Sequence, residues 1–379
     1  MAVARKTRPR SKPRPKPRPT IHDTAHGDGR APSHVALPWH GAADLPAAQV
    51  DSYNLELRDT EGFIGDKASG RAFRDLIDRI RKEGRDLTEH DLRTTRARDM
   101  SKKEFDAILT GEDLGAAAIV HGAIEEFAQS ITAVVQRFLK QKSWRDVQRI
   151  VVGGGLRRSR VGEIAILRAA LLLREAEVDV EIVPLSHHPD EAGLLGGLQL
   201  LAPETMAEHD GFIAVDIGGT NLRCGIVTLK KTDRFGDSAS VELLLHWRHR
   251  DHRPGREEAL DHLGGMLREL AAKAKRRKWK LAPVIAVGCP GLIAKDGWIK
   301  RGAQNLPGNW EAEDFNLTEA LRERLPRIDG RSISVALHND AVVQGLSEVS
   351  RMRDVEHWAV LTIGTGLGNA SYTTVKQDT

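Results

Sequence analysis

Twelve residues in the second half of the chain constrain its fold and chemistry more than any other segment. Residues 212–223, Phe-Ile-Ala-Val-Asp-Ile-Gly-Gly-Thr-Asn-Leu-Arg, form an apolar run that reaches Asp216 and then enters a glycine turn. Glycine has no Cβ, so the backbone N–H groups of such a turn can approach a phosphate closely. A carboxylate at the strand end can hold a metal ion near that phosphate, usually through water. A plain β-hairpin with a Gly-Gly turn would have the same pattern.

Two further segments favour phosphate binding over a plain hairpin. Residues 358–368 form a second apolar strand that enters the turn Gly364-Thr-Gly-Leu-Gly368, and residues 333–338 form a third strand that is followed by Asn339 and Asp340. Two such turns with a carboxylate between them suit phosphoryl transfer. The turns and a metal would hold nucleotide phosphates, while the carboxylate accepts the proton of an attacking hydroxyl. Alternatively, Asp340 serves only as the N-cap of the helix predicted after it.

Hydrophobic periodicity predicts an α/β protein. In the second half, three strands precede alternating helices and strands, which is typical of an α/β domain with a mixed sheet. The expected strands are 212–217, 223–229, 241–247, 283–288, 332–337 and 357–363, and the expected helices are 256–275, 316–325 and 341–352. The first half adds helices at 113–142 and 162–176, a strand that enters the triple glycine 153–155, and a strand at 178–183.

Charge and cysteine usage narrow the class of protein. The segment Arg5–Arg18 carries eight positive charges, so the formal net charge of +4 falls to about −4 without it. We expect this Pro-rich tail to be disordered, either as a solvated extension or in weak contact with a polyanion; it lacks interleaved aromatic residues, so no specific nucleic-acid binding is expected. Cys224 and Cys289 lie in apolar segments and predict buried thiols in a reducing, cytoplasmic setting. No apolar run reaches membrane-spanning length and no secretory signal is expected.

Five motifs give the chain a resemblance to a known family. In chain order they are Asp216-Ile-Gly-Gly-Thr-Asn221, Cys289-Pro-Gly291, Asn305-Leu-Pro-Gly-Asn-Trp310, Asn339-Asp340 and Gly364-Thr-Gly-Leu-Gly368. In this order and spacing the chain resembles the sugar kinases of the ROK family (repressor, open reading frame, kinase) within the actin-like ATPase superfamily. The resemblance implies an α/β, two-lobed actin-like ATPase fold, each lobe built around a ribonuclease-H-like unit.

The first half of the chain resembles the second half of that family. The matching segments are 68–73, 147–156 and 192–198, which in an ordinary member come after the phosphate motifs. The swapped order predicts a circular permutation joined through residues 203–210; an exchange of halves between two chains of a homodimer is the alternative. We therefore expect three parts: a disordered basic tail (1–35), a lobe on the adenosine side (36–205) and a lobe with the phosphate and sugar motifs (206–379).

The resemblance also implies roles for individual residues. It makes Asp340 the general base, places Mg²⁺ near Asp216 with water between them, and assigns phosphate or ATP contacts to Asp216, Gly218, Gly219, Thr220, Asn221, Gly364, Thr365, Gly366, Gly368, Gly153, Gly154 and Gly155. It assigns sugar contacts to Gly291, Asn305 and Asn339. The family's sugar-binding Glu and its Glu-x-x-His pair are missing from their usual places, for which Asp66 and His34 are the candidates. Residues 59–67 contain no cysteine, so the family's thiolate zinc site is not expected.

These residues predict an ATP-dependent carbohydrate kinase of glucokinase type, which phosphorylates a hydroxyl of a hexose or amino-sugar with ATP and Mg²⁺. Two alternatives remain open. The protein could be a catalytically degenerate sugar- or nucleotide-binding regulator of the same family, since the sugar-binding Glu is missing. It could also be a kinase that uses polyphosphate as its donor, for which the basic tail would be convenient.

Overall fold

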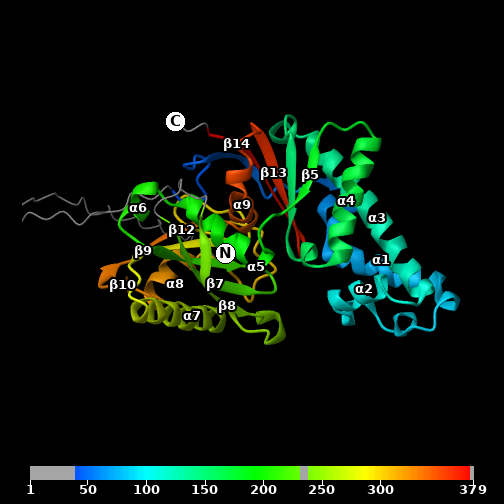
Figure 1. The fold of residues 1–379 in the computed structure, drawn as a ribbon. Coiled ribbons are helices and arrows are strands. Elements are labelled where there is room, and N and C mark those ends of the chain that lie inside the picture. The colour runs from blue at the N-terminus through cyan, green and yellow to red at the C-terminus, as the bar shows by residue number, and fades with distance from the viewer. Residues whose placement is uncertain (1–38, 231–237, 376–379) are drawn as a thin grey trace, which may run out of the picture. The chain divides into compact units, whose positions relative to one another are not determined.

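The structure is a computed structural model that describes residues 39–230 and 238–375. The predicted disordered tail 1–35, and with it His34, lies outside the described residues. Both sheets described below belong to one unit of the chain, residues 35–379. The α/β prediction is confirmed: two five-stranded sheets with helices against them make up the described part of the chain (Figure 1).

The first sheet combines strands from both ends of the chain. Its order is β1 (Ala48–Tyr53), β14 (Leu367–Thr374), β13 (His357–Ile363), β4 (Arg149–Gly153) and β5 (Glu181–Pro184). The helices packed on it are α1 (Gly70–Glu83), α2 (Lys102–Leu109), α3 (Leu114–Leu139) and α4 (Arg160–Glu175). Side-chain caps define where these helices begin, because Ser69, Ser101, Asp113 and Ser159 each accept a hydrogen bond from a free N–H of the first turn.

The second sheet lies within the second half of the chain. Its order is β12 (Ser334–Asn339), β9 (Leu281–Cys289), β6 (Gly211–Ile217), β7 (Leu222–Thr228) and β8 (Ser240–Trp247), with α7 (Arg256–Arg276) and α8 (Leu317–Arg324) on one face. Every residue of the central strand β6 is buried, whereas the edge strand β8 alternates between partly and fully exposed residues. Coverage on both faces explains the unbroken apolar run of β6 in the sequence.

The two sheets have the same strand order. In the second sheet, β8, β7 and β6 are antiparallel neighbours and β6, β9 and β12 are parallel neighbours. In the first sheet, β1, β14 and β13 are antiparallel and β13, β4 and β5 are parallel. The second sheet uses its strands in chain order. The equivalent first two strands of the first sheet, β13 and β14, instead come from the end of the chain, and the other three come from its beginning.

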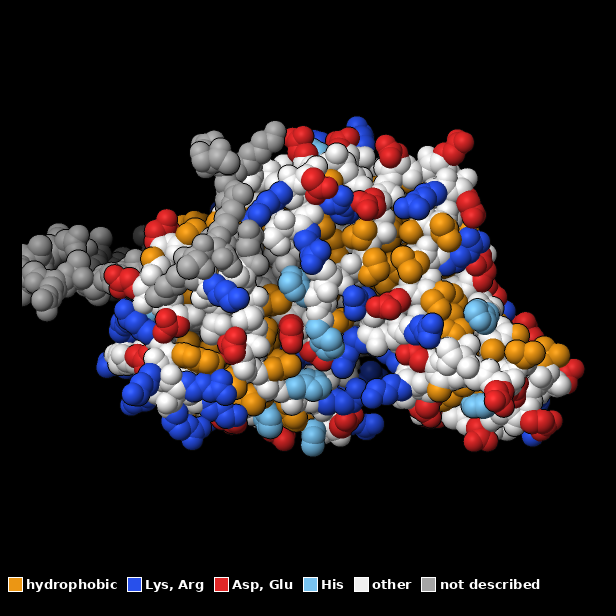
Figure 2. Space-filling model, viewed as in Figure 1, with side chains coloured by type: hydrophobic (Ala, Val, Ile, Leu, Met, Phe, Trp, Pro, Cys, Tyr) orange, Lys and Arg blue, Asp and Glu red, His pale blue; other side chains and the backbone are white. Residues whose placement is uncertain are grey.

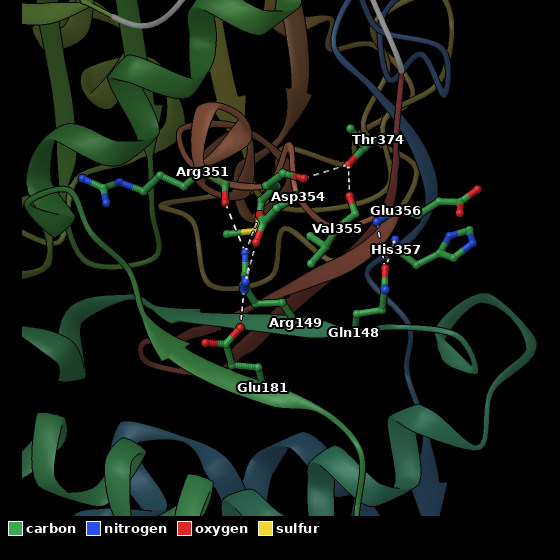
Figure 3. A network of polar contacts seen from close by, with 10 residues as sticks. Gln148, Arg149, Glu181, Arg351, Asp354, Val355, Glu356, His357 and Thr374 are labelled. Carbon is green, nitrogen blue, oxygen red and sulfur yellow. Dashed lines mark hydrogen bonds and ion pairs between the residues drawn. The ribbon is translucent and has the colours of Figure 1, made fainter.

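The first and last described segments lie side by side in the first sheet. Ala48 pairs with Thr374, and the backbone N–H of Val375 donates to the carbonyl of Ala47 at 3.2 Å. A polar network joins the same two parts of the chain (Figure 3). Arg149 on β4 makes a bidentate pair with Asp354, at 2.8 and 2.9 Å, and also contacts Glu181 on β5. The amide oxygen of Gln148 accepts from the N–H groups of Glu356 and His357.

A third group of helices lies between the sheets. These are α5 (Pro189–Leu195), the 3₁₀ helix η7 (Gly196–Leu200), α6 (Pro203–Ala207) and α9 (Asp340–Leu346). They share one hydrophobic core with residues of both sheets, including Phe212 and Ala286 from the second and Val360 and Tyr372 from the first. The packing thus joins the sequence halves through a common core rather than through a flexible link.

The remaining elements are short. They include the strand pairs β2 (Arg58–Asp59) with β3 (Gly62–Phe63) and β10 (Arg327–Ile328) with β11 (Arg331–Ser332), and the 3₁₀ helices η1 (Ile64–Ala68), η6 (Gly155–Arg158) and η8 (His249–Asp251). Among the described residues, no single helix has the length and apolar composition of a membrane span. The pair α2 and α3 meets that test only together, across a bend of 117°.

The predicted elements agree with the structure to within a few residues, with two exceptions. The helix predicted at 341–352 ends early: α9 stops at Leu346, and Val349–Arg351 form a separate 3₁₀ turn. Strands β1 and β14 were not predicted, and the expected joint 203–210 contains the helix α6. Cys224 and Cys289 are buried and unpaired, as predicted.

Candidate active site

The two predicted phosphate turns occupy equivalent places in the two sheets and meet each other. The first connects β6 to β7 and is closed by a 2.9 Å hydrogen bond from Gly218 N–H to the Asn221 carbonyl. The second connects β13 to β14 and is closed by a 2.9 Å bond from Gly364 N–H to the Gly366 carbonyl. The hydroxyls of Thr220 and Thr365 lie 3.1 Å apart. Residues 145 positions apart therefore form one continuous polar surface.

Packing does not explain all of the glycines in these turns. A Cβ on Gly366 would meet no described atom within 4 Å, and one on Gly218 would meet only the Asn221 carbonyl, at 3.4 Å. Gly219 is different, because a Cβ there would lie 2.9 Å from the Cβ of Asn305. Open space above bare backbone is what a closely approaching ligand requires. The geometry thus favours a ligand at both turns.

The triple glycine 153–155 has a packing explanation for two of its members. Gly154 has φ +84°, and a Cβ on it would lie 2.6 Å from backbone atoms of Ile363 on β13. A Cβ on Gly153 would lie 2.6 Å from the amide oxygen of Gln344. Near Gly155 the nearest atom is the Nζ of Lys102, at 3.1 Å. The turn adjoins the second phosphate turn through β13, whereas its predicted contact with the nucleotide stays a prediction.

Two carboxylates lie at the same edge of the second sheet. Asp216 on β6 pairs in register with Gly288 on β9, and Asn339, the residue before Asp340, pairs with the adjacent Cys289. Because β6, β9 and β12 are parallel, their carboxyl ends meet at one edge, where α/β proteins bind ligands. Burial and the negative charge of Asp216 raise the pKa of Asp340 to about 7. Asp340, which is partly exposed, is therefore suited to exchange protons near neutral pH.

An arginine compensates the buried charge of Asp216. The guanidinium of Arg223 donates to Asp216 at 2.9 Å and to Asp190 at 2.8 Å, and all three side chains are nearly buried. Burial raises the pKa of Asp216, and Arg223 opposes that shift. A Cβ on Gly193 of α5 would lie 2.8 Å from the carboxyl carbon of Asp216, so α5 covers this carboxylate.

The predicted sugar-contacting residues divide into two groups. Asn339 donates to the Gly291 carbonyl at 3.0 Å, and its oxygen caps α9 by accepting from the N–H groups of Ala341 and Val342. Gly291 has φ +107°, and Asn305 packs on Gly219. These three residues thus surround the carboxylate edge. Asp66, in contrast, is exposed in η1, and within the described ranges no hydrogen bond or ion pair of its side chain links it to them.

Sequence reasoning missed several residues of the site. Arg223 and Asp190 were not singled out, although an arginine two residues after the glycine turn was a visible signal. The Nε2 of His249 lies 2.8 Å from the Gly218 carbonyl, so this buried ring, whose pKa is lowered by burial, supports the first turn. Asn54, from the first half of the chain, places its amide nitrogen 2.9 Å from where a Cβ of Gly302 would lie, beside Gly291. No local pattern marks such a distant contact.

The sequence profile of the ROK family matches residues 212–374, which include all five motifs. Residues 212–374 are a ROK family domain. The resemblance predicted from the motifs is thereby confirmed. The glucokinase of Thermotoga maritima is 27% identical over 166 residues, which cover 42% of this chain and 44% of that protein. The chain thus spans less than half the length of this curated relative.

Two solved structures of ROK-type proteins are also similar over part of their length. A putative N-acetylmannosamine kinase from Listeria monocytogenes is 25% identical, with a TM-score of 0.33, over 44% of this chain and 49% of that one. A ROK family glucokinase from Streptomyces griseus, in complex with glucose and AMPPNP, is 18% identical, with a TM-score of 0.32, over 44% of this chain and 47% of that one.

Proposed function

We propose that the protein is an ATP-dependent carbohydrate kinase that transfers the γ-phosphoryl group to a hydroxyl of a hexose or amino-sugar. The observation that carries the proposal is the meeting of two glycine turns, through Thr220 and Thr365, beside an edge with a carboxyl group whose pKa is raised to about 7. The ROK family match and the glucokinase relative support sugar as the acceptor. Turnover on a panel of sugars identifies the particular sugar and hydroxyl.

Each part of the site has a role in this reaction. The N–H groups of turns 218–221 and 364–368 bind the donor's phosphates and stabilise charge that spreads over them as the bond to the leaving group breaks. Asp340, in its ionised form, accepts the proton of the attacking sugar hydroxyl. Asn305 and the Gly291 carbonyl segment border the place where that hydroxyl approaches. Arg223 keeps Asp216 ionised in a buried position.

The carboxylate edge also fits Mg²⁺. Asp216 and Asp340 are close enough for the charge of one to raise the pKa of the other, and oxygen ligands of this kind are those that Mg²⁺ takes, with waters completing its shell. Among the described residues there is no cluster of three or more His, Cys, Asp or Glu side chains that would hold a metal by protein ligands alone. When bound near Asp216, the ion would neutralise phosphate charge.

We further propose that the chain is a circularly permuted member of the actin-like ATPase superfamily. The equal strand order of the two sheets supports this, since only the first sheet takes its strands out of chain order. The adjacency of Ala47 and Val375 also supports it, because permutation requires ends that lie close together. One chain completes both sheets through the β1–β14 pairing, so the proposal needs no exchange of halves between two chains.

Steady-state assays with a panel of hexoses and amino-sugars test the kinase proposal. With ATP and Mg²⁺ we expect turnover on at least one sugar, and we expect Asp340→Asn to lower kcat by about 10²- to 10⁴-fold with little change in ATP affinity. Asp314→Asn, which removes an exposed carboxylate, is the matched control and should keep full activity. Measurable sugar binding without turnover on any sugar would contradict the kinase and favour a regulatory binding protein.

A further inference from the structure

Each of the three glycine turns has a cation beside it. At the second phosphate turn the cation is Arg74 on α1. Gly70 N–H donates to the Gly364 carbonyl at 2.9 Å, and Arg74 Nη1 donates to the Gly70 carbonyl at 3.2 Å. The Nε of Arg74 donates to the Ala97 carbonyl, also at 3.2 Å. Both bonds go to neutral carbonyls, which hold the guanidinium in place and leave its charge uncompensated.

The other two turns have a lysine and a second arginine. Lys102, the first residue of α2, is largely buried, and its Nζ donates to the carbonyl of Gly155. Arg250 in η8 is exposed, and its backbone N–H donates to the carbonyl of Thr220 in the first phosphate turn at 3.3 Å. Arg74 and Lys102 come from the first half of the chain and Arg250 comes from the second, so the fold brings the three together.

These cations act on one another more than on carboxylates. Within residues 39–230 and 238–375, neither Arg74, Lys102 nor Arg250 forms an ion pair. Arg250 and Arg248 lower the pKa of Arg74, after burial as the largest cause. Burial, followed by the charges of Arg74 and Arg158, lowers the pKa of Lys102 to about 8, and a nearby carboxylate opposes only part of that shift. Like charges held together without a counter-ion are unfavourable, and a bound anion would relieve that cost.

The surface agrees with this arrangement. Figure 2 shows a hollow bordered by Lys and Arg side chains, in the part of the face that lies between α2 and the end of β8 in Figure 1. A cleft lined by one sign of charge concentrates ligands of the opposite sign. The positions of the three cations, one at each turn, suit a ligand with several phosphates in a row better than a single phosphate ion.

We propose that Arg74, Lys102 and Arg250 form an anion site for condensed phosphate, which holds the phosphate chain of the donor along the three glycine turns. The inference rests on the proposed kinase function for its role in the reaction, but the binding itself does not require turnover. The same chemistry is present in the triphosphate of a nucleotide and in inorganic polyphosphate. Both ligands are therefore included in the test.

Calorimetric titration tests the site with three probes: inorganic tripolyphosphate, ATP and adenosine. The triple variant Arg74→Gln/Lys102→Gln/Arg250→Gln removes the charges, and the Lys102→Gln change keeps a side-chain donor for the Gly155 carbonyl. The matched control is Arg71→Gln/Lys103→Gln/Arg253→Gln, which removes three exposed charges from the same parts of α1 and α2 and from just after η8. Thermal melts establish that both variants fold. If the triple variant does not, the three single variants replace it.

We expect the triple variant to bind tripolyphosphate at least 10-fold more weakly and to lose most of the salt dependence of binding, whereas the control changes affinity less than 2-fold and adenosine binds all three proteins alike. An equal loss for ATP assigns the site to a nucleotide donor, and a loss for tripolyphosphate alone assigns it to polyphosphate. Unchanged affinity for both phosphate ligands, an equal loss in the control, or no phosphate binding by the natural chain would overturn the inference.

Turnover measured on the same proteins separates this inference from the kinase proposal. Cation-dependent binding of tripolyphosphate without turnover on any sugar keeps the anion site and removes the kinase. Normal turnover in the triple variant, together with unchanged binding, keeps the kinase and removes the anion site.

Discussion

At the scale of single residues, Asp340 links the chemistry of the site to the stability of the fold. Its pKa is raised from 3.8 to about 7, first by burial and then by Asp216, so the folded protein holds a proton on Asp340 that the unfolded chain has already released. Between those two pH values the folded state binds more protons than the unfolded state. Stability therefore falls as the pH rises from about 4 to about 7, and the penalty remains above pH 7.

Asp340→Asn should remove this penalty. We expect the variant and the natural chain to be equally stable near pH 4, and the variant to be more stable by roughly 2 kcal/mol at pH 8, a value reduced from the full linkage energy because Asp340 is partly exposed. Urea unfolding at pH 4, 6 and 8 measures the difference. Asp314→Asn should show no such trend. A variant that is less stable than the natural chain at pH 8 would show that Asp340 has a favourable charged partner instead.

At the scale of elements, the first sheet depends on pairs of segments that are far apart in the sequence. Arg149 on β4 is the clearest case, because its guanidinium pairs with Asp354 just before β13 and with Glu181 on β5 (Figure 3). These contacts raise its pKa. The side chain of Arg149 is 17% exposed, whereas those of Asp354 and Glu181 are 64% and 45% exposed. Solvent therefore screens both pairs in part.

Arg149→Met keeps the length of the side chain and removes both pairs. We expect a loss of about 1 kcal/mol in the free energy of unfolding, since partly exposed pairs contribute little and bidentate geometry adds to that. Amide hydrogen exchange should also quicken at residues 354–357, which the Arg149 and Gln148 contacts hold. The control is Arg168→Met on α4, whose pairs with Glu125 and Glu175 stay within the first half. Equal exchange in both variants would contradict the role in joining the halves.

The elements also show what the sequence could predict. Strands β6, β9 and β13 are buried apolar runs next to glycine turns, so their positions and the phosphate motifs were visible. Strand β14 was missed because its inward positions are polar: Asn369 bonds to both backbone groups of Leu55, and Ser371 bonds to Ser52. Their partners lie more than 310 residues away. For the same reason, no pattern indicated Arg223 with Asp190, or Arg74 with the second turn.

At the scale of the whole molecule, chain order and strand order disagree in the first sheet alone. The permutation proposal makes the position of the chain ends incidental to the fold, because the sheet contacts and the shared core stay the same whichever loop is open. Reordering the chain as residues 208–379 followed by 1–207 restores the family's order of motifs. Residues 376–379 and 1–38 then serve as the connection to β1, and the new ends lie between Ala207 and Glu208, which are both exposed.

We expect this reordered chain to fold with the same circular-dichroism spectrum, to lose no more than about 2 kcal/mol of stability from the changed loop closure, and to keep the ligand binding of the natural chain. Denaturant unfolding and ATP titration measure these properties. The control opens the same fused chain between Ala128 and Gln129, inside the buried helix α3, and should not fold. Failure of the 208–207 chain to fold under conditions in which the natural chain is stable would show that the order of the halves matters to the structure. The strand order would then need an explanation other than permutation.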